Sequence, residues 1–176
     1  MIKRIILEGV DGSGKSTVAK EIQEITQFDI VQGSSFEIAK EGRQYMFEYM
    51  LSLAKKDNII MDRFYLSNLV YGKLFDKNTL NSLQVNAIEK ELGNDSLTFI
   101  LLPQRDFLIS NLKKRGDEYI NIEDVDPILE RYEAISENLS SRIQNTRFIP
   151  LRYSSFLTEK DSLLNQIISY LNIYNT

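Results

Sequence analysis

The residues with the clearest chemistry lie in one short segment near the N-terminus, Gly9 to Ser16. The segment reads G-V-D-G-S-G-K-S and matches the phosphate-binding loop pattern G-x-x-x-x-G-K-[ST] at every fixed position. An apolar run over Ile2–Leu7 precedes it, and apolar residues at helical spacing follow it. A glycine loop between a strand and a helix aims backbone N–H groups and the helix N-terminus at an anion. The segment therefore predicts a nucleoside triphosphate site.

The residue types in this loop have separate tasks in phosphoryl transfer. Glycines let the backbone approach phosphate oxygens that side chains would block. Lys15 supplies a charge between the β- and γ-phosphates, and the Ser16 hydroxyl is placed to bind Mg²⁺. Transfer of the γ-phosphoryl group needs positioning and charge neutralisation more than covalent help. The residues expected to hold ATP are Gly9, Asp11, Gly12, Ser13, Gly14, Lys15, Ser16 and Thr17.

A second group with chemical potential follows a short apolar run, Ile59–Met61. Asp62 stands where a carboxylate holds Mg²⁺ through water, and Arg63 next to it could bind a second anion. Taken alone, the pair could be a strand-end Asp–Arg pair without a chemical role. Because the phosphate loop is present in the same chain, we interpret Asp62 and Arg63 as parts of the site.

A third group is the basic run Lys113–Arg115, which ends a predicted helix and is followed by Gly116. Cations at a helix C-terminus are common and need no function. Alternatively, the run belongs to a mobile lid, at about 113–122, that brings Arg115 to the transferred phosphoryl group. Spacing alone does not separate these interpretations.

The composition limits the chemistry that is available. The chain has 176 residues, a net charge of −4, and neither cysteine nor histidine. This excludes disulfides, thiolate nucleophiles and histidine acid–base catalysis, and it gives no overall basic field for a nucleic acid polymer. No apolar stretch approaches the length of a membrane span. We therefore expect a cytoplasmic protein that does not act at a membrane.

Short apolar runs alternate with helical patterns along the whole chain. Strands are expected at 2–7, 28–32, 59–61, 97–102 and 148–151, and the helices after the first at 36–55, 67–74, 79–92, 105–115, 126–143 and 162–174. Strands that are apolar throughout are typical of a parallel sheet covered on both faces. The sequence thus predicts a three-layer α/β fold, a single domain over 1–176 with a parallel sheet of about five strands and helices on both faces. The phosphate loop would follow a central strand.

Together these residues resemble thymidylate kinases, within the wider group of P-loop nucleoside and nucleotide kinases. The loop, with Asp11 inside it, is similar to the loop of that family. Asp62-Arg63, followed by Ser67 and Tyr71, is similar to its Asp-Arg-Tyr motif. The stretch from Leu112 to Tyr132 resembles its lid and the helix that follows.

The resemblance implies specific roles. Asp11 would contact the 3′-hydroxyl of the acceptor nucleotide, Arg63 its 5′-phosphate, and Arg115 the transferred group. Gly12 leaves no arginine inside the loop, and members built in this way resemble the subgroup whose basic lid supplies the catalytic arginine. The implied catalytic residues are Lys15, Arg115 and Asp11.

The chain departs from the family after the second predicted strand. The family's Arg-Glu-Pro-Gly-Gly segment is absent, and Gly33–Glu37 stands in its place. The family's base-reading Phe and Arg have no direct counterparts, although Phe36, Arg43 and Phe47 are available. The substrate-binding residues proposed on this basis are Asp11, Phe36, Arg43, Phe47, Arg63 and Tyr71.

Several functions remain open at this point. The first is a Mg²⁺- and ATP-dependent deoxynucleoside monophosphate kinase similar to thymidylate kinases. Asp62 favours it, because the deoxynucleoside kinases use glutamate at that position. The alternatives are a kinase of deoxynucleosides or other small molecules, and a nucleotide-binding module without turnover. A homodimer could form through the helix around Tyr45–Leu53 or Ser67–Leu74.

Overall fold

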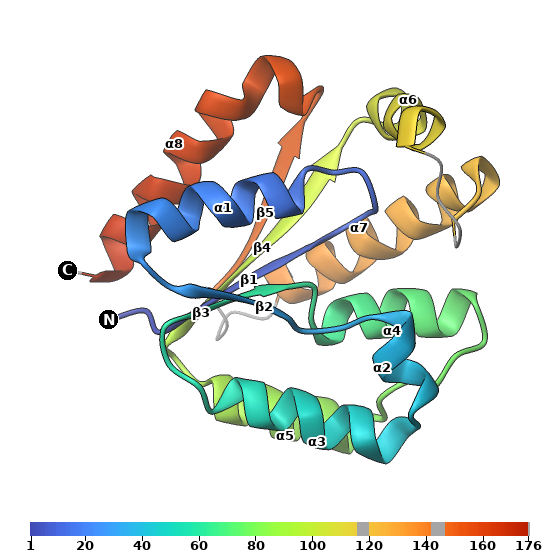
Figure 1. The fold of residues 1–176 in the computed structure, drawn as a ribbon, viewed down its shortest axis with the longest axis vertical. Helices are drawn as coiled ribbons and strands as arrows, with labels where there is room; N and C mark the ends of the chain where they lie inside the picture. The colour runs from blue at the N-terminus through green and yellow to red at the C-terminus, as the bar shows by residue number, and fades with distance from the viewer. Residues whose placement is uncertain (116–119, 142–146, 176) are drawn as a thin grey trace.

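The computed structural model describes residues 1–115, 120–141 and 147–175 and forms a five-stranded parallel sheet (Figure 1). The order of the strands is β2-β3-β1-β4-β5. The strands are β1 (Arg4–Gly9), β2 (Asp29–Gln32), β3 (Ile59–Asp62), β4 (Ser96–Pro103) and β5 (Phe148–Tyr153). The predicted α/β fold with helices on both faces of a parallel sheet is confirmed.

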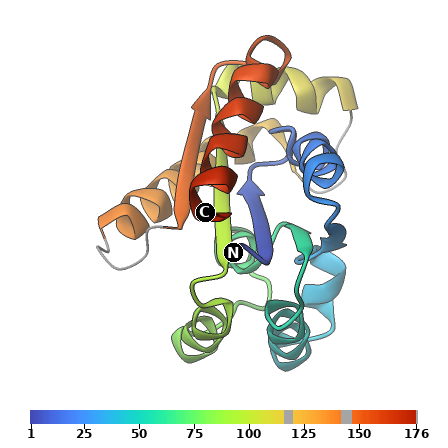
Figure 2. The ribbon, with the colours of Figure 1, turned by 90° about the vertical axis from the view of Figure 1, so that its left-hand side faces the viewer.

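Helices form a layer on each face of this sheet. They are α1 (Lys15–Thr26), α2 (Phe36–Lys40), α3 (Arg43–Ala54), α4 (Tyr65–Leu74), α5 (Ser82–Leu92), α6 (Arg105–Arg115), the short 3₁₀ turn η1 (Ile122–Asp124), α7 (Val125–Ser141) and α8 (Phe156–Asn175). Helices α1 and α8 cover one face, and α3, α4, α5 and α7 cover the other (Figures 1 and 2). Within the described ranges, no helix combines the length and apolar character needed to cross a membrane.

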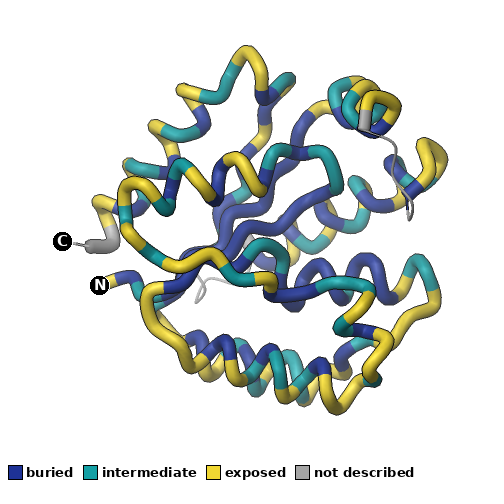
Figure 3. The backbone as a smooth tube through the Cα atoms, in the orientation of Figure 1, coloured by how far each residue is buried: buried dark blue, intermediate teal, exposed yellow. Residues whose placement is uncertain are grey.

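The two faces of the sheet carry separate apolar cores. Alternate residues of β1 point in opposite directions, so Ile5 and Leu7 pack with α1 and α8 while Ile6 packs with the other helices. Every residue of β1 and β4 is buried (Figure 3). This double burial explains why the central strands are largely apolar, with Arg4 and Glu8 as the buried charged residues of β1.

Some predicted boundaries were wrong. The helix expected over 36–55 is broken into α2 and α3 at Gly42, whose φ of 104° an L side chain rarely adopts. The last helix begins at Phe156 rather than at residue 162. The backbone geometry of Gly42 decides the first boundary, and at the second the Ser155 hydroxyl accepts from the backbone amide of Leu157 at 3.3 Å.

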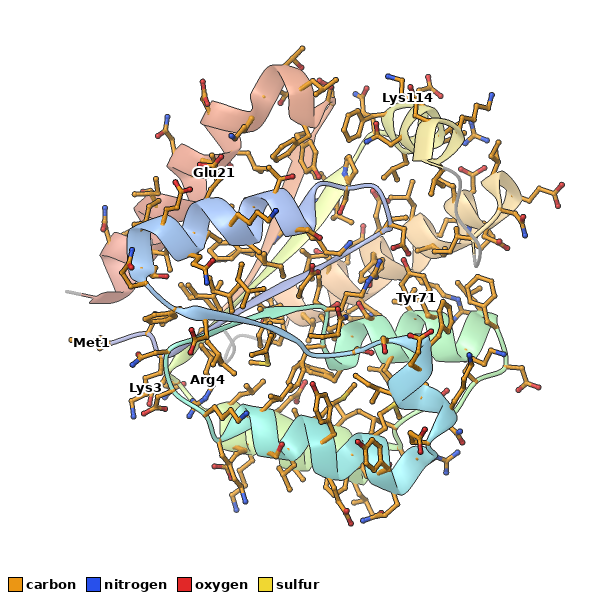
Figure 4. All side chains as sticks on the ribbon, in the orientation of Figure 1. Met1, Lys3, Arg4, Glu21, Tyr71 and Lys114 are labelled. Carbon is orange, nitrogen blue, oxygen red and sulfur yellow. The ribbon has the colours of Figure 1, made fainter. Side chains whose placement is uncertain are left out.

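A buried arginine fixes the end of the sheet that lies opposite the phosphate loop (Figure 4). Arg4 is 7 % exposed, and its guanidinium donates to the carbonyl of Lys56 at 2.8 Å and to that of Leu92 at 3.4 Å. It also donates to the Asp57 carboxylate at 3.1 Å. Carbonyls at a helix C-terminus lack partners within the helix. Arg4 thus holds the end of α5 and the turn that follows α3 against β1.

We expect Arg4→Met to lower the free energy of unfolding by about 2–3 kcal/mol, because charged hydrogen bonds to buried carbonyls are lost. Urea unfolding followed by circular dichroism measures it. Lys3→Met is the matched control: Lys3 also pairs with Asp57, but both side chains are exposed, so its loss should stay below about 1 kcal/mol. Equal losses in the two variants would contradict this role of Arg4.

Candidate active site

Two cavities meet at the carboxyl ends of the central strands. The first, here called the loop cavity, has a volume of about 340 Å³. It is lined by Asp11, Gly12, Gly14, Lys15, Ser16, Thr17, Gln32, Asp62 and Arg63. The second, here called the aromatic cavity, has a volume of about 170 Å³. It is lined by Asp11, Gln32, Ser34, Ser35, Phe36, Glu37, Ala39, Arg63, Ser67, Asn68, Tyr71, Gly72 and Ile120. Both cavities share Asp11, Gln32 and Arg63, so they lie next to each other, and the two together are here called the cleft.

The phosphate loop joins β1 to α1 and is held from outside by α6. Gly12 has φ 79°, and a Cβ there would lie 3.3 Å from the Cβ of Asn111. The Asn111 side-chain amide donates to the Gly12 carbonyl at 2.9 Å. The last residue of α6, Arg115, follows Asn111 by about one helical turn. The helix that ends in the basic run is therefore attached to the loop itself.

Lys15 is folded against the carbonyls of its own loop. Its ammonium donates to the carbonyls of Gly9 at 2.9 Å and Val10 at 2.7 Å, and to the Ser13 hydroxyl at 3.3 Å. Burial, together with the positive charge of Arg63, lowers the pKa of Lys15 to about 7. In the free site the charged form of Lys15 is thus disfavoured, and a bound phosphate would stabilise it.

Ser16 and Asp62 are adjacent, as expected for two residues that share a metal ion. The Ser16 hydroxyl donates to the Asp62 carboxylate at 2.9 Å. Among the described residues, no group of three or more carboxylates could by itself hold a metal. A Mg²⁺ ion, which keeps several waters and takes phosphate oxygens, needs only such a pair from the protein. The donor set therefore fits magnesium that enters with a nucleotide.

Arg63 lies at the junction of the two cavities in a left-handed backbone conformation, with φ 64°. Its guanidinium pairs with the Asp11 carboxylate and donates to the Gly9 carbonyl at 3.2 Å. Its Cζ also lies 5.0 Å from the ring centroid of Tyr71, a cation–π distance. The Tyr71 hydroxyl donates to Asp11 at 2.9 Å. These contacts orient one cation towards both cavities.

Neighbouring charges outweigh burial in setting the pKa values of Asp11 and Arg63. Burial opposes the ionisation of Asp11, but the positive charges of Arg63 and Lys15 hold its pKa below the usual value. Burial lowers the pKa of Arg63, but Tyr71 and Asp11 raise it by more, so the pKa lies above its usual value. Asp11 and Arg63 are therefore a permanent ion pair near neutral pH.

Aromatic rings form one wall of the aromatic cavity. Phe36 meets Tyr71 edge-to-face, with ring centroids 6.1 Å apart and an interplanar angle of 87°. Phe36 is the first residue of α2, whose N-terminus is capped by the Ser35 hydroxyl. A planar base can bind against such a wall.

The structure brings most of the predicted site residues together, but not all of them. The residues that line the cleft are Gly12, Gly14, Lys15, Ser16, Thr17, Asp11, Phe36, Asp62, Arg63 and Tyr71. Arg43 is exposed at the start of α3, and the half-buried Phe47 packs on the core. Neither lines either cavity, so their predicted contact with the substrate has no support in this arrangement.

The predicted lid lies partly outside the described residues. This applies to 116–119 and to the side chain of Arg115, so its expected role stays a prediction. Lys114 is exposed on the outer side of α6 (Figure 4).

Sequence reasoning missed three residues that shape the site. Glu8 is buried beneath the loop, Gln32 lines both cavities, and Asn111 holds the Gly12 carbonyl. A signal for Glu8 exists, because a charged residue directly after the apolar run Ile5–Leu7 of a central strand requires buried partners. Gln32 and Asn111 carry no such signal.

Comparison with known proteins identifies the family. No protein-family model matches the chain. YorR, an uncharacterized protein of the SPbeta prophage of Bacillus subtilis, is 42% identical over 135 residues, which are 76% of this chain and 82% of YorR. The chain belongs to the YorR family. A crystal structure of YorR in complex with phosphorylated GDP has a TM-score of 0.83 at 35% identity and covers 98% of this chain and 97% of YorR.

Kinases with the same fold are more distant. Deoxyadenosine kinase from M. mycoides with bound dCTP has a TM-score of 0.62 at 21% identity, covering 96% of this chain and 98% of that enzyme. Thymidylate kinase from Candida albicans has a TM-score of 0.62 at 18% identity, covering 98% of this chain and 93% of that enzyme. At these identities the likeness shows the fold alone, which is that of the P-loop kinases.

The position of Lys15 leads to a testable prediction on pH. In the free protein its pKa is about 7, so at pH 8 most Lys15 is neutral. A bound triphosphate favours the ammonium form of Lys15 and raises this pKa, so the protein should take up about one proton when it binds ATP at pH 8. For the same reason, the affinity for ATP should fall as the pH rises above 7. Calorimetric titration in two buffers of different ionisation enthalpy measures the uptake.

Lys15→Met is the control, since it cannot take up this proton. Identical binding heats of the unmodified protein in both buffers at pH 8 would contradict the prediction.

Proposed function

We propose that this protein is a Mg²⁺- and ATP-dependent kinase of (deoxy)nucleoside monophosphates, similar to thymidylate kinases. An oxygen of the acceptor phosphate would attack the γ-phosphorus of ATP, and the bond between that phosphorus and the β–γ bridging oxygen would break. The products are ADP and a nucleoside diphosphate. The main support is the position of Arg63, which lines both the loop cavity and the aromatic cavity.

A cation at that junction favours an acceptor that itself carries a phosphate. A guanidinium has five N–H donors, so Arg63 can bind a phosphate while it stays paired with Asp11. A nucleoside without a phosphate would bring no second anion to Arg63, which would keep only its pairing with Asp11. The aromatic cavity would then hold the base, next to Phe36 and Tyr71.

The other residues take roles that follow from their contacts. Lys15 would bind the β- and γ-phosphates, and Ser16 and Asp62 would hold Mg²⁺, which neutralises charge on the transferred group. Asp11 is engaged by both Arg63 and Tyr71, so a contact with a sugar hydroxyl would share its oxygens with them. Arg115 would supply the catalytic arginine, supported by the attachment of α6 to Gly12.

The relative YorR points to guanine nucleotides as ligands worth testing. Its crystal structure contains phosphorylated GDP and is 35% identical to this chain. A guanine nucleotide could serve this protein as donor or as acceptor. A nucleotide-binding module without turnover is the alternative that would share this site.

A panel assay with an Arg63 variant tests the acceptor class. We expect ADP release in a coupled assay to respond to one or more nucleoside monophosphates, with guanine nucleotides included, and not to nucleosides. Arg63→Lys keeps the charge but loses the planar fork, so the KM for the monophosphate should rise about 10–100-fold, with the Kd for ATP changing less than about threefold. Faster phosphorylation of nucleosides would contradict the proposal. Tight ATP binding without transfer to any acceptor would favour the binding module.

Arg115 and Lys114 form a matched pair for the lid. Arg115→Ala should lower kcat about 10³-fold, because an arginine finger acts mainly on the transition state. Lys114→Ala removes a neighbouring exposed cation and should change kcat less than about twofold. Steady-state kinetics, with nucleotide binding measured separately by calorimetry, make the comparison. Equal effects of the two variants would mean that the basic run only stabilises the helix end.

A further inference from the structure

Glu8 is the one charged residue that β1 buries beneath the phosphate loop. It is 0 % exposed and directly precedes Gly9. Its carboxylate accepts from the backbone amides of Phe64 at 3.0 Å, Leu66 at 3.0 Å and Ser67 at 3.1 Å, and from the Ser67 hydroxyl. Four donors thus converge on one buried carboxylate.

This carboxylate takes the place of a helix cap. The N-cap residue of α4 is Phe64, which has no polar side chain to satisfy the first amides of the helix. Glu8 reaches these amides from another element, and its negative charge lies at the positive end of the ten-residue helix. Burial raises the pKa of Glu8, and its hydrogen bonds with Ser67 act in the opposite direction. The carboxylate and the helix end therefore depend on each other.

The turn that Glu8 holds carries the groups proposed to bind the acceptor. Arg63 directly precedes the capped residues, and its amide donates to the Leu7 carbonyl at 2.9 Å. Ser67 and Tyr71, both on α4, line the aromatic cavity. Residues 63–67 are thus joined to the last residues of β1 before the phosphate loop. Arg63 and the phosphate loop are therefore both attached to the same two residues of β1, Leu7 and Glu8.

A buried tyrosine of α7 joins the hydrogen bonds around Glu8. The hydroxyls of Ser67 and Tyr132 are 2.8 Å apart. Since a serine hydroxyl has one proton and Ser67 gives it to Glu8, Tyr132 must donate to Ser67. Tyr132 is fully buried in α7. Three elements, β1, α4 and α7, therefore meet through a chain of hydrogen bonds that ends on Glu8.

From this geometry we infer that Glu8 is a positioning residue for the acceptor: by capping α4 from β1, its carboxylate fixes Arg63 relative to the phosphate loop, and acceptor binding depends on it more than ATP binding does. The inference rests on the proposed function, because it takes Arg63 as the acceptor-phosphate ligand. Glu8 itself touches no substrate.

Glu8→Gln is the direct test, since it keeps the size of the side chain and one acceptor oxygen but turns an N–H₂ group towards donors. The KM for the best monophosphate should rise about tenfold or more, while the Kd for ATP alone should change less than about threefold. Hydrogen exchange at residues 63–67 should speed up at least about tenfold relative to α8. The matched control is Ile167→Ala, a buried residue of α8 on the other face of the sheet; it should lower stability without separating the two nucleotide affinities.

A double variant separates positioning from loss of stability. If Glu8 acts through Arg63, Glu8→Gln should add little to the rise in KM already caused by Arg63→Lys, whereas independent sites would add in free energy. Should Glu8→Gln not fold, Tyr132→Phe removes one donor from the same chain and should raise the acceptor KM about threefold, again with little change for ATP. Parallel changes for both nucleotides, or an unchanged acceptor KM, would overturn the inference.

The two proposals fail differently. If the unmodified protein releases no ADP with any monophosphate, the proposed kinase activity fails. Calorimetric binding of monophosphates then decides the role of Glu8: weaker binding in Glu8→Gln supports it, and unchanged binding, or no binding to the unmodified protein, overturns it.

Discussion

Two cationic side chains share a single backbone carbonyl at the centre of the site. The Gly9 carbonyl accepts from Lys15 at 2.9 Å and from Arg63 at 3.2 Å. Because both cations are buried, burial and mutual repulsion lower the pKa of Lys15. The negative charges of Asp11, Asp62 and Glu8 act in the opposite direction and partly offset this lowering. Under the proposed function, phosphates would bring negative charge to the place where these two cations share a carbonyl.

The register of the sheet creates this arrangement. Leu7 of β1 pairs with Asp62 of the neighbouring β3, so the chain leaving β3 continues beside Glu8 and Gly9. On the other side, Gly9 pairs with Leu101 of β4 so closely that a Cβ would lie 2.5 Å from the Leu101 carbonyl. The central place of β1 in the strand order thus brings the loop, the Ser16–Asp62 pair and Arg63 to the carboxyl ends of the strands.

Local patterns predicted the loop, the parallel sheet and the Asp62–Arg63 pair, because each depends on residues that are neighbours in the sequence. The role of Glu8 could not be predicted in the same way, since its partners lie on α4, more than fifty residues away. The same limit explains why the predicted contacts of Arg43 and Phe47 with the substrate have no support in the structure. Their types suit a base, but the break at Gly42 separates α2 from α3, and α3 turns Phe47 towards the core.

The wall of the aromatic cavity and the position of Arg63 are mechanically linked in this protein. A Cβ at Gly33 would lie 2.1 Å from the Arg63 carbonyl, so the connection after β2 packs directly on the turn that carries Arg63. That connection then presents Ser34, Ser35 and Phe36 to the aromatic cavity. Because this turn supports both a wall of the aromatic cavity and Arg63, a change in the segment after β2 that shifts this packing would also move Arg63. Under the proposed function, acceptor specificity would therefore depend on how this segment and the Arg63 turn pack together, and exchanging the side chains that line the aromatic cavity would alter only part of it.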